Sequence, residues 1–275
     1  MWSMPVWYTH TDHFRRAQTP TERGPCWFVS SVLSVQSQIR NFIRNLCARL
    51  GKEADVANDY VPWKQDYVSE FLSLRCAGDV LNIVAPLGSR ANKEITESMA
   101  IVKRLRPILL KQPVSLRLVE LCAGNALTSV LVCHLLPVLS AKAYDVKKRR
   151  RHWFRCDRFT YYQEDINGPK FGERLGNADI VIAVHPCREL AVEVCRLFVA
   201  SRARYLLLMP CCKGSLPAEA HQTSEPLVNN KLTAYERWCL GMSSMLRSMG
   251  SFDAVCERDT KCISPCNIVI KAVRL

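Results

Sequence analysis

The sequence predicts an α/β protein with a doubly wound, mostly parallel, seven-stranded sheet that ends in an antiparallel hairpin, together with a helical N-terminal extension. Two observations support this fold class. From about Ser115 onward, short apolar runs alternate with segments of helical length. Near the carboxyl end this alternation stops, and two apolar runs follow each other with only a short loop between them.

Each predicted strand is a short apolar run bounded by polar or turn residues. The first five lie at 116–121, 141–144, 160–163, 180–184 and 205–209. Helices are expected between them at 126–136, 147–155, 188–201 and 228–249. The runs at 254–256 and 267–273 form the hairpin that completes the sheet.

The predicted domains are a helical extension over residues 1–110 and the α/β domain over residues 111–275. Apolar residues recur at helical spacing within 30–51, 67–74 and 92–110. The first 50 residues are rich in arginine and poor in acids. This composition is typical of a mitochondrial targeting segment, which we place at 1–25, and equally of a nucleic-acid-binding arm.

Composition narrows the class of protein and its partners. The chain has 275 residues, of which 48% are hydrophobic, and a net charge of +13. Such a charge attracts polyanions, so RNA is the expected partner; an anionic membrane surface and a generally basic soluble protein are the alternatives. No apolar run reaches the roughly 20 residues of a transmembrane helix. Fourteen cysteines without a secretory signal indicate a reducing compartment, with the mitochondrion favoured over cytoplasm or nucleus.

Acidic residues stand where three predicted strands end, which is where open α/β sheets bind ligands. Glu120 closes the first strand and is followed by a loop of small residues that a ligand can approach closely. Asp145 comes about 20 residues after the loop, where an acid can accept hydrogen bonds from a ribose. A tight turn with nothing bound would not require these acids. The predicted nucleoside-binding residues are Glu120, Cys122, Ala123, Gly124, Asn125, Ala126, Asp145, Glu164, Asp165, Ile166 and Val184.

This arrangement, over roughly residues 110–275, resembles the class I S-adenosylmethionine-dependent methyltransferases, which have a Rossmann-like fold. In that family the first strand ends in an acid and a loop near G-x-G-x-G. Asp145 matches the acid that holds the ribose, and Asp165 matches the acid that reads the adenine amino group. Cys122 and Ala126 replace the first and third glycines and leave only Gly124. The resemblance implies S-adenosylmethionine as cofactor, and the final hairpin also matches this fold.

The segments "AVHPCREL" (183–190) and "LMPCCKG" (208–214) follow the fourth and fifth strands. They resemble a subgroup that carries His-x-Cys-Gly-Asp-Leu and a Cys-Cys pair at these places and is associated mainly with RNA. Arg188 and Glu189 replace its Gly-Asp. His185 is the candidate catalytic base, and Cys187, at a predicted helix start that favours the thiolate, is the candidate nucleophile. The alternative is that both only shape the pocket wall.

Metal binding has weak support in the cysteine spacing. Zinc sites favour pairs separated by two to four residues. Only Cys262 and Cys266 meet this spacing, and their neighbours lie on predicted core strands, while Cys211 and Cys212 are adjacent. We therefore expect no metal site.

The most basic run, "KKRRRHWFRCDR" at 147–158, follows Asp145 and should border the cofactor site. Arginines hold phosphates, and aromatic rings stack on unpaired bases. A nuclear-localisation patch and a solvated helix face, with Trp153 and Phe154 turned to the core, are the alternatives. The predicted RNA-binding residues are Lys147, Lys148, Arg149, Arg150 and Arg151.

Taken together, these features predict an S-adenosylmethionine-dependent methyltransferase that modifies RNA, either rRNA or tRNA, with a ribonucleoprotein particle as a further partner. A different class of function is an inactive methyltransferase-fold protein that serves as an RNA-binding or ribosome-assembly factor, which Cys122 and Ala126 favour. A protein methyltransferase is a third possibility.

Overall fold

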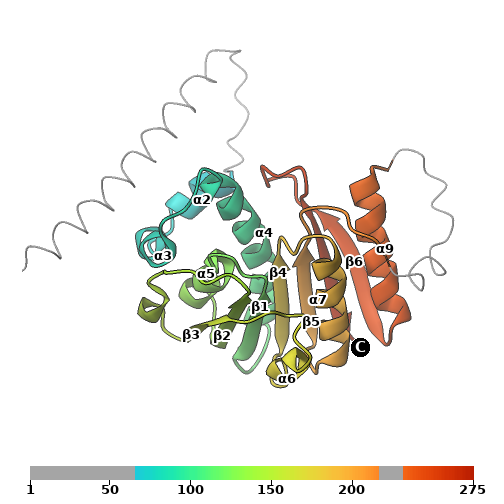
Figure 1. Cartoon of the computed structure of the whole chain (residues 1–275). Helices are drawn as coiled ribbons and strands as arrows, with labels where there is room; N and C mark the ends of the chain where they lie inside the picture. The colour runs from blue at the N-terminus through green and yellow to red at the C-terminus, as the bar shows by residue number, and fades with distance from the viewer. Residues whose placement is uncertain (1–65, 217–231) are drawn as a thin grey trace, which may run out of the picture. The chain divides into compact units, whose positions relative to one another are not determined.

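The computed structural model describes residues 66–216 and 232–275 (Figure 1). These residues belong to one compact unit. The helix expected at 30–51, the targeting segment expected at 1–25 and the start of the helix expected at 228–249 lie outside the described residues.

A seven-stranded sheet forms the centre of this unit, in the order β3-β2-β1-β4-β5-β7-β6. The first five strands are parallel, and β7 pairs antiparallel with both β5 and β6. This confirms the predicted doubly wound sheet with its terminal hairpin. The strands are β1 (Leu116–Leu121), β2 (Val138–Asp145), β3 (Phe159–Gln163), β4 (Ile180–Val184), β5 (Tyr205–Met209), β6 (Phe252–Arg258) and β7 (Ile268–Arg274).

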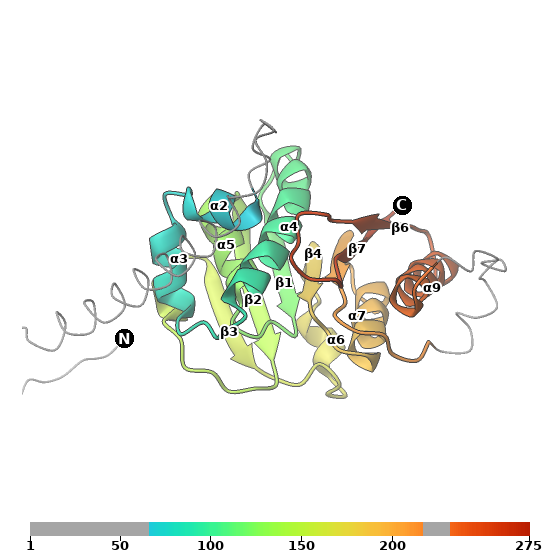
Figure 2. The ribbon, with the colours of Figure 1, turned by 90° about the horizontal axis from the view of Figure 1, so that it is seen from above.

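Helices cover both faces of the sheet. Figures 1 and 2 show α2 to α5 on one face and α6, α7 and α9 on the other. Within the described ranges, no helix is both long and apolar enough to cross a lipid bilayer. The helices are α2 (Tyr67–Leu72), α3 (Ala77–Val84), α4 (Ala91–Leu110), α5 (Leu127–Leu135), α6 (Phe171–Arg174), α7 (Glu189–Ala200) and α9 (Ala234–Ser248).

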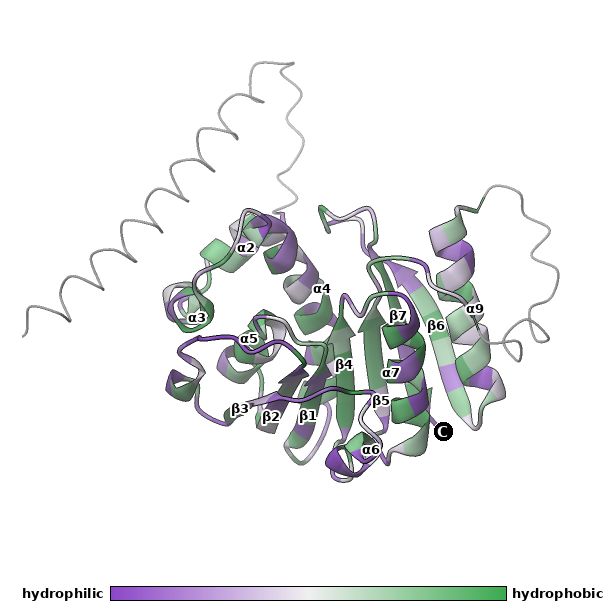
Figure 3. Cartoon of the chain, in the orientation of Figure 1, coloured by the Kyte–Doolittle hydropathy of each residue, from purple (hydrophilic) through white to green (hydrophobic). Residues whose placement is uncertain are grey.

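Side chains of β1 alternate between the two faces of the sheet, so this strand contacts the helices on both faces. Val119 and Leu121 join the apolar core beneath α7 and α9, and successive residues of a strand point to opposite faces. Glu120 therefore faces α5, where its carboxylate meets the backbone of Ser129. β4 is buried along nearly its whole length, as expected for a central parallel strand, and Figure 3 shows the apolar centre of the sheet.

Helix α4 is built into the same unit as the sheet, although the sequence pattern grouped it with the N-terminal extension. Its Arg104 donates hydrogen bonds to Asp259 at 2.6 Å and to Glu257 at 2.9 Å. The Tyr67 hydroxyl of α2 donates to the same Asp259 carboxylate at 2.9 Å. Burial alone would raise the pKa of Asp259, but the hydrogen bonds from Arg104 and Tyr67 hold it below its usual value. This network ties α2 and α4 to the β6–β7 hairpin.

The prediction of a helix at 147–155 is wrong. The chain there is irregular apart from one 3-10 turn, Trp153–Arg155. The reason lies in tertiary contacts: Arg151 donates to the Asn125 side chain at 3.0 Å, and the His152 backbone N–H donates to the carbonyl of Ile83 at 2.9 Å. These contacts draw the segment across the β1–α5 loop and outweigh its local helix propensity.

Candidate functional site

A cavity of about 480 Å³ opens at the carboxyl ends of β1 to β4. The chain order reverses between β1 and β4, which is the position where open α/β sheets bind ligands. Ala126 is buried next to the cavity without lining it. The other predicted cofactor residues line it: Glu120, Cys122, Ala123, Gly124, Asn125, Asp145, Glu164, Asp165, Ile166 and Val184.

The loop after β1 has three left-handed residues. Cys122, Gly124 and Ala126 have φ values of 55°, 55° and 57°. Glycine adopts this conformation freely, whereas an L-residue does so at a cost of about 1–2 kcal/mol. The surrounding structure therefore holds Cys122 and Ala126 in the backbone shape that glycines would take.

Asp145 joins the loops that follow β1 and β2. One carboxylate oxygen accepts the Gly124 backbone N–H at 2.9 Å, and the other accepts the Lys147 N–H at 2.8 Å. A carboxylate has about four lone-pair sites, so two bonds leave capacity for the hydroxyls of a ligand. Asp145 is half-buried and lines the cavity. It can therefore hold the loop and contact a ribose at the same time.

Asn125 is held from several directions. Arg149 and Arg151 donate to its side-chain oxygen, and the Trp153 indole donates to its backbone carbonyl at 3.1 Å. Its amide donates to Glu94 of α4 at 3.2 Å. The basic segment and α4 thus fix the loop before any ligand arrives, which lowers the ordering cost of binding.

A stacked aromatic pair supports this loop. The rings of Trp153 and Tyr161 are parallel, with centroids 3.6 Å apart. The Tyr161 hydroxyl also donates to the carbonyl of Gly124 at 3.2 Å. The indole of Trp153 is therefore committed to the β1–α5 loop and is not turned into the core.

Two carboxylates that follow β3, Glu164 and Asp165, also line the cavity. Glu164 accepts a hydrogen bond from Arg174 at 3.1 Å, and Asp165 is exposed and accepts from the backbone N–H of Asn167 at 3.0 Å. Buried Ile166 adds an apolar surface beside them. An acid next to an apolar wall can accept from an amino group while the wall packs on a flat ring.

Glu120 is a deeply buried carboxylate of the cavity, with 2% of its surface exposed. It accepts the backbone N–H of Ser129 at 3.0 Å, near the start of α5. Burial raises the pKa of Glu120 to about 7, and the hydrogen bonds from Ser129 offset only part of this effect. Glu120 therefore caps a helix and changes charge near neutral pH.

Replacing Glu120 should remove a pH dependence of stability. In the unfolded chain this carboxyl loses its proton near its ordinary pKa, while the folded protein keeps it until about pH 7. Wild-type stability should therefore fall between these two values as the pH rises. Glu120→Gln should be more stable than wild type at pH 8 by about 2–3 kcal/mol, with little difference at pH 4.

Urea unfolding at both pH values measures this effect, with the exposed Glu173→Gln as control. A stability difference for Glu120→Gln that is the same at pH 4 and pH 8 would contradict the assigned protonation.

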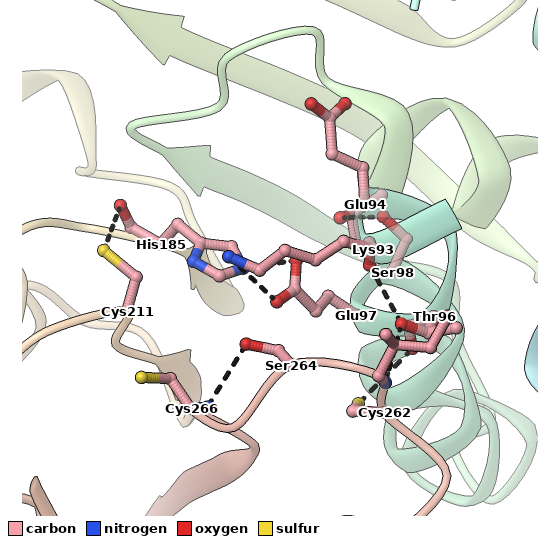
Figure 4. Close-up of polar contacts among 12 residues, drawn as sticks. Lys93, Glu94, Thr96, Glu97, Ser98, His185, Cys211, Cys262, Ser264 and Cys266 are labelled. Carbon is pink, nitrogen blue, oxygen red and sulfur yellow. Dashed lines mark hydrogen bonds and ion pairs between the residues drawn. The ribbon is translucent and has the colours of Figure 1, made fainter. Parts of the chain in front are cut away.

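His185 meets an acid that lies far away in the sequence (Figure 4). Its Nε2 pairs with a carboxylate oxygen of Glu97, which extends from α4 and is 1% exposed. The second oxygen of Glu97 is 3.8 Å from the ammonium of Lys93. His185 itself is left-handed, with φ 65°, and lines the cavity. A buried acid that orients an imidazole is the arrangement that prepares a histidine to take up a proton.

Glu97 lines the cavity and pairs with His185, and the sequence pattern did not reveal it as a candidate. It lies within "EITESMAIV", on a helix that precedes the first strand of the sheet. The sequence feature that could have identified Glu97 is a charged residue within an otherwise apolar helical stretch, because a buried acid needs a partner. The partner follows β4, so spacing along the chain could not identify it.

Cys187 lies at the mouth of the cavity with two further thiols. Its sulfur is 3.2 Å from that of Cys211 and 3.6 Å from the carbonyl oxygen of His185. Helix α7 begins at Glu189, so Cys187 precedes the helix by two residues. Cys212 completes a group of three sulfurs that lie within 4.8 Å of one another. The structure thus joins the two cysteine-containing segments that follow β4 and β5.

Comparison with known proteins agrees with this site. A family model described as a methyltransferase domain matches residues 90–219, which include α4, the β1–α5 loop and His185. No curated protein matches the chain by sequence.

Several solved structures are similar to the chain. Magnesium protoporphyrin IX methyltransferase (ChlM) from Synechocystis, with bound SAH, is 12% identical with a TM-score of 0.45; the alignment covers 72% of this chain and 94% of that one. The antibiotic-resistance methyltransferase Kmr is 11% identical with a TM-score of 0.40 and coverage of 59% and 87%. The 16S rRNA (adenine(1408)-N(1))-methyltransferase from Catenulisporales acidiphilia is 17% identical with a TM-score of 0.37 and coverage of 59% and 86%.

The methyltransferase-domain model covers residues 90–219, and the cavity within this range can be tested against S-adenosylmethionine as a cofactor. The residues present fit this cofactor. A volume of about 480 Å³ lies within the range of about 300–1,000 Å³ for small-molecule sites. Asp145 and Asp165 offer acceptors for hydroxyl and amino groups, and Ile166 and Val184 offer apolar walls. The left-handed loop lets a ligand approach its backbone.

Proposed function

We propose that this protein transfers the methyl group of S-adenosylmethionine to RNA, with rRNA and tRNA as substrate classes. The observation that carries the proposal is the position of the basic segment 147–151, which lies directly against the cofactor loop. Arg149 reaches Asn125, and both Lys147 and Arg149 line the cavity. Positive charge at the rim of a methyl-donor site would place a phosphate backbone next to the reacting methyl group.

The segment divides into two sets of side chains. Arg149 and Arg151 are half-buried and bind the loop, whereas Lys147, Lys148 and Arg150 are exposed. The exposed set can neutralise phosphates; Lys148 and Arg150 do so from outside the cavity lining, whereas Lys147 does so from the cavity rim. The chain's net charge of +13 adds a long-range attraction for the same kind of partner.

An exposed aromatic ring lies beside these charges. Phe154 has 80% of its surface exposed, and the guanidinium of Arg155 lies 5.7 Å from the ring centroid. Large exposed aromatic rings are uncommon on soluble proteins, and in nucleic-acid sites they stack on unpaired bases. Phe154 supports a single-stranded or looped RNA as substrate.

The chemistry needs few protein groups, because S-adenosylmethionine supplies an already activated methyl group when bound. His185 accepts the proton of the attacking nitrogen or hydroxyl, and Glu97 holds the imidazole ring in place. Since Nε2 pairs with Glu97, Nδ1 is the nitrogen that takes the proton. The loop after β1 and Asp145 orient the donor, and positioning supplies most of the rate enhancement.

An inactive RNA-binding role was favoured by the replacement of two loop glycines. The left-handed backbone at Cys122 and Ala126 weakens that argument, because the loop keeps its shape. The presence of Glu97 beside His185 also supports a working enzyme. Mitochondrial localisation and a ribonucleoprotein partner stay predictions from composition alone.

Neutralising the exposed set should weaken RNA binding through salt-sensitive contacts. Each phosphate neutralised on a single strand contributes about −0.7 to the slope of log affinity against log salt. Replacing Lys147, Lys148 and Arg150 by Gln should therefore make the slope shallower by about 2. Fluorescence anisotropy with a labelled single-stranded RNA at several salt concentrations measures it.

The matched control replaces Arg106, Lys111 and Arg117, which are exposed near the C-terminal end of α4 and the start of β1, and should leave the slope nearly unchanged. Equal slopes for both triple variants would mean that the basic segment does not bind RNA.

A further inference from the structure

The three thiols at the cavity mouth have no role in methyl transfer as described. Cys187 follows β4, and Cys211 and Cys212 follow β5. The two strands are paired in register, with Val184 opposite Met209, so their ends deliver these cysteines to one place. All three are free thiols, and Cys187 is exposed while the other two are half-buried. An ion from solvent can reach the group.

From this group we infer a zinc site whose protein ligands are the sulfurs of Cys187, Cys211 and Cys212. Tetrahedral zinc with Zn–S bonds of about 2.3 Å places its sulfur ligands about 3.8 Å apart. The sulfur of Cys211 lies 3.2 Å from that of Cys187 and 3.7 Å from that of Cys212. Small side-chain rotations would bring all three to the spacing that the ion needs.

The backbone around the thiols keeps the two loops together. His185 and Arg188 both have positive φ values, 65° and 50°, so the loop after β4 bends sharply on each side of Cys187. Gly214 packs on that loop so closely that a Cβ there would lie 2.8 Å from the carbonyl carbon of Arg188. The relative position of Cys187 and the Cys211–Cys212 pair is therefore set by the fold and not by the thiols themselves.

The type of ligand atom determines which metal the site prefers. Three soft thiolates favour zinc over magnesium and calcium, which prefer oxygen ligands. Three protein ligands leave one position of a tetrahedral ion open, as in zinc sites that bind a water or a substrate atom. Cys187 and Cys211 both line the cavity, so the open position lies near its mouth. This assignment makes Cys187 a metal ligand instead of the nucleophile that the sequence suggested.

Spacing along the chain could not predict this site. The usual zinc signature places two to four residues between paired ligands, and here Cys187 and Cys211 are 24 positions apart. Cys262 and Cys266, which do have that spacing, lie outside the group.

The test measures bound metal in the full-length protein, purified under reducing conditions without chelators. We expect one zinc per chain by elemental analysis. Replacement of that zinc by cobalt should give the strong near-ultraviolet absorption of cobalt–thiolate bonds. Cys187→Ser, Cys211→Ser and Cys212→Ser should each lose most of both signals. The matched control is Cys266→Ser, because Cys266 is also half-buried and is outside the group; it should keep both.

Three results would overturn the assignment. One is a folded, reduced wild-type protein that takes up neither zinc nor cobalt. The second is metal that remains bound after all three ligands are replaced together, with folding confirmed by circular dichroism. The third is a Cys187–Cys211 disulfide found by mass spectrometry in the protein as isolated, which would assign the pair to redox chemistry. Binding of S-adenosylmethionine is measured separately. A protein without zinc could still bind S-adenosylmethionine, and a protein that does not bind S-adenosylmethionine could still hold zinc, so the two proposals fail independently.

Discussion

Gly124→Arg should abolish detectable binding of S-adenosylmethionine while the protein remains folded. Gly124 is left-handed, with φ 55°, and a Cβ at this position would lie 3.9 Å from the guanidinium of Arg149. A long cationic side chain would extend into the space that the donor needs and would meet Arg149 with like charge. The left-handed conformation itself costs an L-residue only about 1–2 kcal/mol, as Cys122 and Ala126 already illustrate. We expect a loss of affinity of about 100-fold or more, on the order of 3 kcal/mol.

Isothermal titration calorimetry measures this loss, and circular dichroism checks the fold. The matched control is Gly172→Arg in α6, where a Cβ meets no atom within 4 Å. Unchanged affinity in folded Gly124→Arg would remove the β1–α5 loop from the donor site.

Breaking the His185–Glu97 pair should slow methyl transfer far more than it weakens donor binding. General bases contribute about 10²–10⁴-fold to rate. His185→Ala should lose kcat within that range, because it removes the imidazole that Glu97 orients at the cavity. Glu97→Gln should lose less, because the imidazole stays while its orienting acid is neutralised. The assay follows labelled methyl transfer to RNA isolated from cells that lack the protein.

Glu97→Asp provides the matched control, since it keeps the carboxylate and shortens the side chain by one carbon; it should recover part of the lost rate. A kcat for His185→Ala equal to that of wild type would show that His185 only shapes the pocket wall.

The strands were predictable because their buried runs are short, apolar and bounded. β1, β4 and β5 begin and end where their sequences indicate. β2 begins at Val138, earlier than expected, because Pro137 ends α5 and the chain pairs with β1 at once. The acids at strand ends could also be predicted, because parallel strands bring their carboxyl ends to one edge.

The basic segment could not be predicted, because its structure depends on distant partners. Local propensity favours a helix at 147–155, but Asn125 and Ile83 bind its side chains and backbone. The same contacts turn Arg149 and Arg151 inward and leave Phe154 exposed. The division of this segment into loop-holding and RNA-facing residues is therefore visible only in three dimensions.

The parts of the site that joined distant segments were the hardest to foresee. Glu97 reaches His185 from a helix that precedes the sheet, and Cys187 meets Cys211 across neighbouring loops. A sequence records spacing along one element, whereas these pairs depend on how two elements pack. In the structure, such pairs are recognised by a buried charged residue or by a cluster of thiols.

The most direct test of the donor site is calorimetry with S-adenosylmethionine on the wild type and on Asp145→Ala. Asp145 holds the backbone N–H of Gly124 and faces the cavity, so its removal takes away both the loop anchor and a ligand acceptor. The control is Asp157→Ala, an exposed acid outside the cavity lining. We predict micromolar binding in the wild type and in the control, and loss of binding in Asp145→Ala. Well-folded wild-type protein that binds no S-adenosylmethionine would contradict the account and favour an inactive RNA-binding protein.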